Sequence, residues 1–532
     1  MSPAFIFFIF QKSSWNTHCV DHPKSILSTM KTPKLFSIGK VFILASGLFI
    51  SCNDETEPII ETPSMTPMVD FTALGEGNQL YFFEEGNLNS PTGMQSISGL
   101  PAGEMILSID YRPATGQLYG LGASSRLYVI NETSGAATAL GTTVFTPAID
   151  GTASLDFNPT VDRIRLVSES GQNLRLHPET GAVVATDGRI NGGMNPKIAA
   201  VAYTNSVSGA TSTTLYDIDI AQDKLYKQNP PNDGGLEEIG NLGIDLDGNV
   251  DFDINPDNSQ ALAVARNTNE TRLYSIDLNS GRATWVGVFS QPIISFSFKT
   301  NPVAYAADAS GKLYRFNPMM PQPSMVDFQG LAMGEVIVGL DFRPANGQLL
   351  AISNRSQLYA VNPSNGALTK IGSPLNPMLM GSVVGFDFNP TVDRIRLVTD
   401  SGQNLRLHPD LGTVVATDGN LNPGMPKVSA AAYTNNFVGT SATALFVIDH
   451  ETNMLYTQTP PNDGVLVPVG LLGIAITADN GFDIGGRSNQ AFAVLRVGNS
   501  TGVYRINLMT GAATKTADLA FTPTAMAVGL GF

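Results

Sequence analysis

The sequence predicts an all-β protein, and three observations support this prediction. The 532 residues include 52 Gly and 33 Pro, and only 14% are charged, a composition typical of many short strands joined by turns. Residues 156–188 and residues 387–419 differ at only 5 of 33 positions, so the chain is internally duplicated. A shorter repeat recurs within each copy. At this length we expect two all-β units.

The shorter repeat has the length of a propeller blade. A strand that opens on an apolar residue, mostly followed by Tyr or Arg, recurs every 40–51 residues, and such periods with four short strands are typical of propellers. Residues 106–141 contain one complete unit, in which we expect ILSIDYRP, QLYGLG, RLYVIN and AATALG to be successive strands from the inside outward. The ten openings are Leu80, Leu127, Leu174, Leu225, Leu273, Leu313, Leu358, Leu405, Leu455 and Val503.

The position at which each copy starts and ends within the shorter repeat predicts two tandem five-bladed β-propellers. Residues 69–100 supply the second to fourth strands of a blade, and residues 293–298 supply a lone inner strand. The second copy repeats this order and ends in residues 525–532. Pairing the last strand with the first blade leaves no exposed sheet edge. We expect one propeller in residues 68–299, the first repeat, and one in residues 300–532, the second repeat. One ten-bladed ring is the alternative.

The duplicated segment also carries a family resemblance. The motif NPTVDRIRLV followed by GQNLRLHP resembles a bacterial family known only as domain of unknown function 4394. The resemblance covers nearly all of residues 68–532 in two copies. It implies secreted or lipid-anchored propellers with no assigned activity.

The N-terminus is similar to a lipoprotein signal peptide. Residues 30–51 contain three Lys followed by an apolar stretch, and Ser51 precedes Cys52, the order in which a signal is removed and the Cys thiol receives a lipid. We expect Met30 to be the start and residues 1–29 to be a non-native upstream extension. An ordinary secretory signal or an uncleaved anchor are the alternatives. The acidic, Pro-containing tether of residues 52–67 resembles a surface-export signal of some lipoproteins, and this resemblance implies an outer-membrane lipoprotein displayed on the cell surface.

Charge and cysteine usage exclude several classes of protein. The net charge is −15 and there is no basic stripe, which argues against nucleic-acid partners. We expect membrane contact only through the lipid. The two cysteines are Cys19 and Cys52; the first precedes the expected cleavage site and the second carries the lipid. Disulfides and cysteine nucleophiles are therefore not expected in the mature protein.

The duplicated blade places cations where other blades have apolar or tyrosine side chains. A three-residue hairpin at 169–171 pairs Arg165 with Arg175 and Arg163 with His177. Like charges opposite each other are destabilising, and buried cations need partners. The anion is either a carboxylate of the chain (Asp156, Asp187 or Glu169) in a structural ion network, or a bound sugar acid or partner carboxylate. The candidate ligand-binding residues are Arg163, Arg165, Arg175, His177, Asp187, Arg394, Arg396, Arg406, His408 and Asp418.

An Asp recurs at the ends of the expected inner strands. An Asp before a turn usually bonds nearby backbone N–H groups in an Asx-turn, and this is our expectation. The alternative is a ring of carboxylates that binds a cation at the mouth of the channel. The residues are Asp110, Asp156, Asp253, Asp341, Asp387 and Asp483.

A calcium site is a further hypothesis. The segment DLDGNVD places oxygen ligands at alternate positions, a spacing that suits Ca²⁺. The Gly stands at the fourth position rather than the sixth, and the bidentate Glu of calcium loops is missing. The candidate ligands are Asp245, Asp247, Asn249 and Asp251. The matching loops NPPNDG (229–234) and TPPNDG (459–464) are interpreted as turns.

The motifs of common enzymes are missing. There is no HExxH and no Gly-rich phosphate loop in the sequence, and the one GxSxG match, GNSTG (498–502), is not a nucleophile elbow because no helical run follows it. We therefore expect a cell-envelope lipoprotein that binds a glycan or protein without catalysis and without a cofactor. One alternative is a propeller hydrolase or lyase that uses channel carboxylates and Arg. The other is a structural spacer in an envelope complex.

The lipid anchor is testable by substitution. Replacing Cys52 with Ala should move the protein from the membrane fraction to the soluble fraction, because the thiol that accepts the lipid is lost. Cell fractionation followed by immunoblotting measures this. The control Ser64→Ala, a change within the tether, should leave the distribution unchanged. A membrane-bound Cys52→Ala variant would contradict the anchor.

Overall fold

The computed structural model describes residues 69–84, 86–267 and 270–532. Within these residues the chain forms forty β-strands and two one-turn 3-10 helices, which confirms the all-β prediction. No helix in the described part has the length and hydropathy of a membrane span. The expected extension, signal peptide, Cys52 and tether lie outside the described residues.

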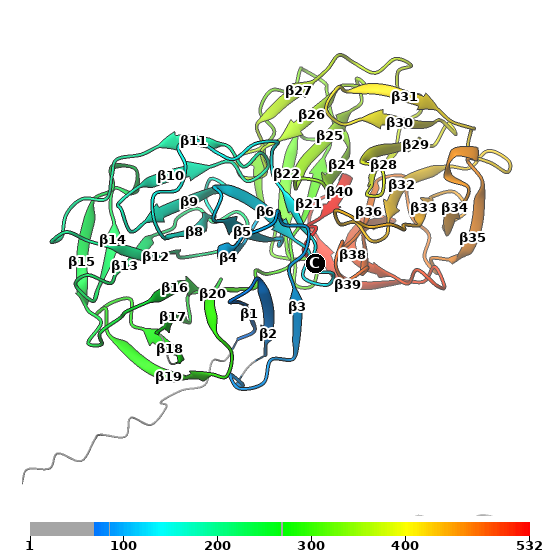
Figure 1. The fold of residues 1–532 in the computed structure, drawn as a ribbon. Coiled ribbons are helices and arrows are strands. Elements are labelled where there is room, and N and C mark those ends of the chain that lie inside the picture. Colours follow the sequence, from blue (N-terminus) through cyan, green and yellow to red (C-terminus); the bar gives the residue numbers. More distant parts are fainter. Residues whose placement is uncertain (1–68, 85, 268–269) are drawn as a thin grey trace, which may run out of the picture. The chain divides into compact units, whose positions relative to one another are not determined.

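The first repeat contains five antiparallel sheets of four strands each among its described residues (Figure 1). In hydrogen-bonded order the sheets are β20 (Ile293–Phe298), β1 (Phe71–Gly75), β2 (Gln79–Phe83) and β3 (Gly93–Ser96); β4 (Ile106–Tyr111), β5 (Leu118–Gly122), β6 (Arg126–Ile130) and β7 (Ala137–Ala139); β8 (Ala153–Asn158), β9 (Arg163–Ser168), β10 (Asn173–Leu176) and β11 (Val183–Thr186); β12 (Ile198–Tyr203), β13 (Leu215–Asp219), β14 (Lys224–Gln228) and β15 (Leu236–Asn241); β16 (Asn249–Ile254), β17 (Ala261–Arg266), β18 (Thr271–Ile276) and β19 (Ala283–Phe289).

The described residues of the second repeat form five sheets with the same connectivity. They are β40 (Pro523–Val528), β21 (Ala304–Asp308), β22 (Lys312–Phe316) and β23 (Ser324–Asp327); β24 (Ile337–Arg343), β25 (Gln348–Ser353), β26 (Leu358–Val361) and β27 (Leu368–Ile371); β28 (Val384–Asn389), β29 (Arg394–Thr399), β30 (Asn404–His408) and β31 (Thr413–Thr417); β32 (Val428–Tyr433), β33 (Leu445–Asp449), β34 (Met454–Gln458) and β35 (Leu466–Leu471); β36 (Asn480–Ile484), β37 (Ala491–Val497), β38 (Ser500–Ile506) and β39 (Ala513–Leu519).

The last strand of each repeat pairs with the first. In the first repeat β20 pairs antiparallel with β1, with Phe298 opposite Phe71. In the second repeat β40 pairs with β21, with Val528 opposite Ala304. This is the pairing that the phase of the units predicts. Each repeat thus completes its first sheet with a strand from its own end.

One strand of every sheet contacts its counterparts in the neighbouring sheets. In the first repeat these inner strands are β4, β8, β12, β16 and β20, and β20 contacts β4 again. The inner strands of the second repeat are β24, β28, β32, β36 and β40, with the same return from β40 to β24. Apolar side chains fill the space between adjacent sheets. One such cluster joins Leu121 and Leu127 of one sheet to Leu155 and Leu166 of the next, so the core consists of layers between sheets.

Each repeat is expected to fold alone, because the closing strand and its partner belong to the same repeat. Residues 64–299 expressed separately should give a cooperative thermal transition and a far-UV circular dichroism spectrum of β type. The corresponding fragment 300–532 is the matched comparison. Unfolded or aggregated products from both fragments would instead support one ring of ten.

Candidate functional site

Arg165 lies at the centre of a buried polar network in the duplicated sheet. It is on β9, opposite Arg175 on β10, and is only 2% exposed. Its guanidinium donates to Asp187 Oδ2 at 2.6 Å and to Asn173 Oδ1 at 2.8 Å. It also donates to Asn232 Oδ1 at 2.7 Å. Both terminal nitrogens of the guanidinium are therefore engaged within the chain.

Asp187 neutralises both arginines of this network. Its Oδ2 accepts from Arg175 Nε at 2.7 Å, and its Oδ1 accepts from Arg175 Nη2 at 2.9 Å. Because the same carboxylate also accepts from Arg165, it lies between two cations that would otherwise repel each other across the strands. The anion that we expected between Arg165 and Arg175 is thus the carboxylate of Asp187. Asp156 instead belongs to the central cluster described below.

The second repeat has the same network. Arg396 donates to Asp418 Oδ2 at 2.7 Å, to Asn404 at 2.8 Å and to Asn462 at 2.7 Å. Arg406 donates to both oxygens of Asp418, at 2.8 and 2.9 Å. Burial alone would raise the pKa of Asp418, but the hydrogen bonds and charges of the two arginines hold it below its ordinary value.

The two PPNDG loops complete these networks. Each contains a one-turn helix, η1 (Pro231–Asp233) or η2 (Pro461–Asp463), so the interpretation as turns is correct but incomplete. Asn232 reaches Arg165 on the neighbouring sheet, and Pro231 O accepts from Asn173 Nδ2 at 2.9 Å. Gly234 has φ 71°, and a Cβ there would lie 2.3 Å from Arg189 O. Glycine therefore allows the loop to lie this close to the neighbouring sheet.

Arg163 and His177 do not join the network around Arg165. Arg163 Nη1 donates to the carbonyl of Asp162 at 2.7 Å, and His177 Nδ1 accepts from the N–H of Glu179 at 3.2 Å. Burial, together with the charges of Arg163 and Arg112, lowers the pKa of His177 to about 4. The imidazole is therefore neutral at pH 7. In the second repeat Arg394 and His408 make the corresponding bonds, to Asp393 O and from Asp410 N.

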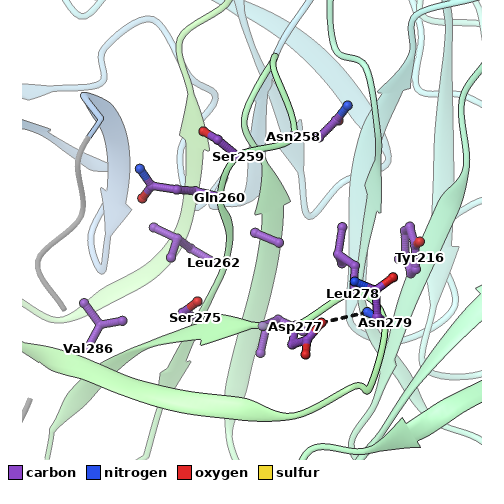
Figure 2. A pocket seen from close by; sticks show the side chains of 12 residues that line it. Tyr216, Asn258, Ser259, Gln260, Leu262, Ser275, Asp277, Leu278, Asn279 and Val286 are labelled. Atoms are coloured by element: carbon purple, nitrogen blue, oxygen red, sulfur yellow. Dashed lines mark hydrogen bonds between the residues drawn. The ribbon is translucent and has the colours of Figure 1, made fainter. Parts of the chain in front are cut away.

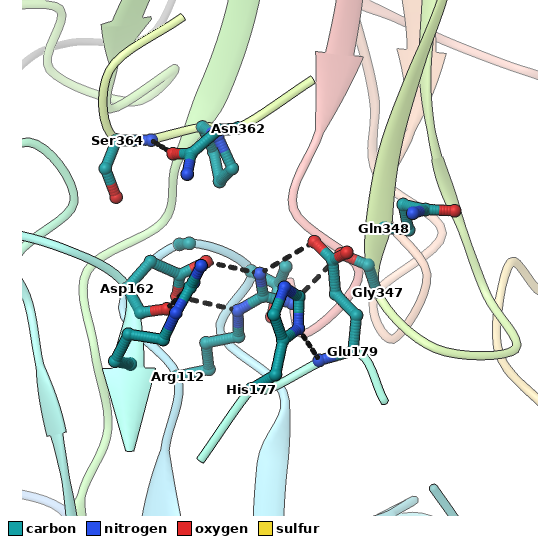
Figure 3. Close-up of polar contacts among 12 residues, drawn as sticks. Arg112, Asp162, His177, Glu179, Gly347, Gln348, Asn362 and Ser364 are labelled. Carbon is teal, nitrogen blue, oxygen red and sulfur yellow. Dashed lines mark hydrogen bonds and ion pairs between the residues drawn. The ribbon is translucent and has the colours of Figure 1, made fainter. Parts of the chain in front are cut away.

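A second buried cation, Arg112, was not found from the sequence. It is 0% exposed, and its Nε donates to Asp162 Oδ1 at 2.9 Å. Figure 3 shows Asp162 and Glu179 on either side of the guanidinium. Its Nη1 donates to Gly347 O of the second repeat at 3.0 Å. The sequence does contain a signal for this pair, because Arg112 in DYRP and Asp162 in NPTVDR both recur in the second repeat, as Arg343 and Asp393.

Three inner-strand aspartates of each repeat converge. Ligand atoms of Asp110, Asp156 and Asp253 lie within 4.8 Å of one another. Asp110 accepts from its own neighbour Tyr111 N at 2.7 Å and from Phe157 N, on the inner strand of the next sheet, at 2.8 Å. An Asx-turn would instead use the N–H two residues onward. The Asx-turn expectation is therefore wrong for these residues, which tie neighbouring sheets together.

The second repeat contains the equivalent triplet of Asp341, Asp387 and Asp483. Burial raises the pKa of Asp110 and of Asp483 to about 7. The pKa of each of the other four aspartates is raised well above the ordinary value by burial and by the charges of neighbouring aspartates; these are Asp156, Asp253, Asp341 and Asp387. Each triplet therefore holds protons at neutral pH.

The space beside the inner strands of the first repeat is small. A cavity of about 60 Å³ is lined by Ser108, Ser154, Asp251 and residues of the other inner strands. Three carboxyls meet, as a channel enzyme would require, but Asp110, Asp156 and Asp253 are all buried and none of them lines this cavity.

The segment proposed to bind calcium is not brought together. Asp251 is buried on β16 and accepts from Phe296 N at 3.0 Å, whereas Asp245, Asp247 and Asn249 are exposed. Among the described residues the acidic groups close enough to share an ion are the two triplets of inner-strand aspartates.

Asp217 is a buried acid without a partner. It lies on β13, is 0% exposed, and neither carboxyl oxygen has a hydrogen-bond partner. Burial raises its pKa well above the ordinary value, and the charge of Arg165 opposes this only partly. The second repeat has Val447 at the same place, opposite Ala431 as Asp217 is opposite Val201.

Comparisons with known proteins identify a family. The model of a family described as Domain of unknown function (DUF4394) matches residues 79–297 and again residues 312–529. A solved structure titled "Structure of Dos1 propeller" is 11% identical, with 63% of this chain and 92% of that chain covered and a TM-score of 0.25. No curated protein matches the chain. The described residues have an all-β fold of ten four-stranded sheets.

Removing the shared carboxylate tests the network. Asp187→Asn should destabilise the protein by about 3–5 kcal/mol, because Arg165 then lies buried without a counter-charge. Asp418→Asn is the matched variant of the second repeat and should behave alike. Arg175→Leu should cost only about 1 kcal/mol, because that side chain is 34% exposed. Urea unfolding measures all three, and an Asp187→Asn variant as stable as the parent would contradict the argument.

Asp217 should make stability depend on pH. Because its folded pKa is raised, the folded state keeps a proton that the unfolded state loses above pH of about 3.9. The free energy of unfolding therefore falls as pH rises through the folded pKa, by about 1.4 kcal/mol per pH unit at most. Asp217→Val should raise the melting temperature, and more at pH 8 than at pH 5. Val447→Asp should have the opposite effect, and a pH-independent difference would contradict the buried acid.

Proposed function

The chain belongs to the Domain of unknown function (DUF4394) family, which it contains twice, and on this premise we propose that it is a cell-envelope lipoprotein whose two five-bladed propellers bind a glycan or a protein without catalysis. The five-plus-five arrangement is supported by the contacts of the inner strands, which return from β20 to β4 and from β40 to β24. The same contacts support the division at residues 299 and 300.

The main support for binding rather than catalysis is that the titratable side chains around Arg165 and His177 already have partners within the chain. Asp187 is shared by two arginines, and Arg165 meets three further polar groups. His177 is neutral and accepts from a backbone N–H. A catalytic base or nucleophile needs free lone pairs directed at a substrate. These groups instead hold the scaffold together, so the ligand is expected at grooves between sheets and at loops.

The alternative function is a hydrolase or lyase that uses the central carboxyls. One observation favours it: Asp110, Asp156 and Asp253 converge, and burial raises the pKa of each, as a general acid requires. The burial of all three carboxyls and the backbone hydrogen bonds of Asp110 oppose it.

The envelope location rests on the sequence of residues 30–67. The Ser51-Cys52 order supports lipidation, and the acidic tether supports display at the cell surface. A glycan or an envelope protein is then the partner that such a protein meets.

The full chain should bind at least one member of a printed oligosaccharide array or one purified envelope protein, and should not cleave it. The readout for cleavage is release of reducing ends from the bound oligosaccharide over hours. Cleavage that is lost in Asp156→Asn would replace the proposal with the hydrolase. A chain that binds neither an oligosaccharide nor an envelope protein would overturn the proposal in favour of a structural spacer.

A further inference from the structure

Methionine side chains lie on the surface of this protein rather than in its core. The chain has 17 methionines, of which 13 belong to the described residues and four are at positions 1, 30, 65 and 68. Eleven of the 13 are exposed, although methionine is among the residue types that are most often buried. Met333, Met509 and Met425 have exposed fractions of 96%, 89% and 82%. Packing of the core therefore does not explain why these residues are methionines.

The exposed methionines lie outside the layers between sheets. Nine of the eleven are in loops and turns between the strands. The other two, Met94 and Met325, are on β3 and β23, which are the outermost strands of their sheets. Met526 of β40 is the contrast, because it is 4% exposed and belongs to a core cluster with Phe492 and Val494. A chemical change at the exposed sulfurs therefore leaves the apolar layers intact.

The same loop backbone carries methionines in the second repeat and other residues in the first. A glutamine donates through its amide nitrogen to a loop carbonyl, at 2.9 Å in the second repeat and 2.8 Å in the first. Its amide oxygen accepts from the N–H two residues later, at 3.0 and 3.2 Å. The glutamines are Gln403 and Gln172, and they hold Met378 and Met380 in the second repeat and Ala148 and Asp150 in the first.

Met509 is a second case of this kind. Its N–H donates to Asn507 Oδ1 at 2.9 Å. In the first repeat the N–H of Asn279 donates to Asp277 Oδ1, also at 2.9 Å (Figure 2). The turn therefore forms equally well with asparagine. Eight of the eleven exposed methionines belong to the second repeat, and the shared fold does not require the methionines at 378, 380 and 509.

An exposed thioether reacts with oxidants that donate an oxygen atom, such as hypochlorous acid. The sulfur lone pair forms an S–O bond with the oxygen of the oxidant while the O–Cl bond breaks, and chloride and the hydroxyl proton leave. The sulfur is oxidised by two electrons and the chlorine is reduced by two, which gives methionine sulfoxide. Cysteine thiols do not compete within the described residues, because both cysteines precede residue 69.

We propose that the exposed methionines consume hypochlorous acid and related oxygen-donating oxidants while the fold remains intact. A sulfoxide is more polar than a thioether, so in an exposed loop it stays in water and disrupts no packing. At Met526 the same change would place a polar group among apolar side chains. Methionine sulfoxide reductases reverse the step. This inference goes beyond the proposed binding function and does not rest on it.

Stepwise oxidation of the purified full chain tests the order and the tolerance. Up to eleven molar equivalents of hypochlorous acid are added, one for each exposed methionine, and peptide mass spectrometry counts sulfoxides at each position. The exposed methionines should be oxidised before Met526, with the melting temperature within about 2 °C of the parent. A melting temperature that falls further as the exposed methionines are oxidised would overturn the proposal. Oxidation of tyrosine, tryptophan or lysine before methionine would do the same.

A triple variant with the residues of the first repeat tests the consumption itself. The chain is mixed with a reporter enzyme that hypochlorous acid inactivates, and the amount of oxidant that halves the reporter's activity is measured. With the triple variant this amount should fall by three molar equivalents of the chain, because three thioethers are lost. A control triple variant, which removes exposed apolar side chains without sulfur, should protect as the parent does. The methionine variant is Met378→Ala, Met380→Asp and Met509→Asn, and the control is Val144→Ala, Val392→Ala and Leu411→Ala.

Equal protection of the reporter by the parent and the methionine variant would overturn the proposal. So would a loss of protection in the control variant as large as that in the methionine variant, because the effect would then not come from sulfur. Should the methionine variant lose stability, leucine at the same three positions provides the second test. Leucine keeps an apolar side chain of similar size without the thioether, and the same loss of three equivalents is expected.

Discussion

Aspartate side chains, rather than main-chain pairing, join the inner strands of neighbouring sheets. Buried N–H groups must find acceptors, and an inner strand has only one neighbour in its own sheet. Phe157 N is satisfied by Asp110 at 2.8 Å, and Phe298 N by Asp253 at 2.8 Å. Ser297 then donates to Asp110 at 2.7 Å. These bonds join neighbouring inner strands, and apolar side chains pack between the same neighbouring sheets.

This arrangement has an electrostatic consequence. Carboxyls that bridge sheets at the centre of a repeat necessarily approach one another, and three like charges within 4.8 Å cannot all be ionised. Protonated carboxyls lose no bond as acceptors of N–H groups and gain a donor for a neighbour. The same proximity that suggests a catalytic cluster is therefore explained by the fold, which weakens the case for chemistry at the centre.

The sequence predicted local features better than contacts between sheets. The strands of residues 106–141 and the closing strand 293–298 followed from turn residues and spacing, and β4 to β7 and β20 lie there. The need for an anion near Arg165 and Arg175 followed from cross-strand pairing. The contribution of Asn232 did not, because it comes from a loop 67 residues away from Arg165 and nothing local marks it. Asp217 was missed because a single acid in an apolar strand resembles an exposed position.

The duplication separates what folding requires from what it does not. Both repeats have the same topology, so a side chain needed for folding is expected in both, as Arg165 and Arg396 or Asn232 and Asn462 are. Asp217 and Val447, or Ser275 and Arg505, differ although their backbone registers agree. A buried acid without a partner lowers stability, and Val447 shows that the fold does not need one. The shared fold therefore does not require these particular side chains.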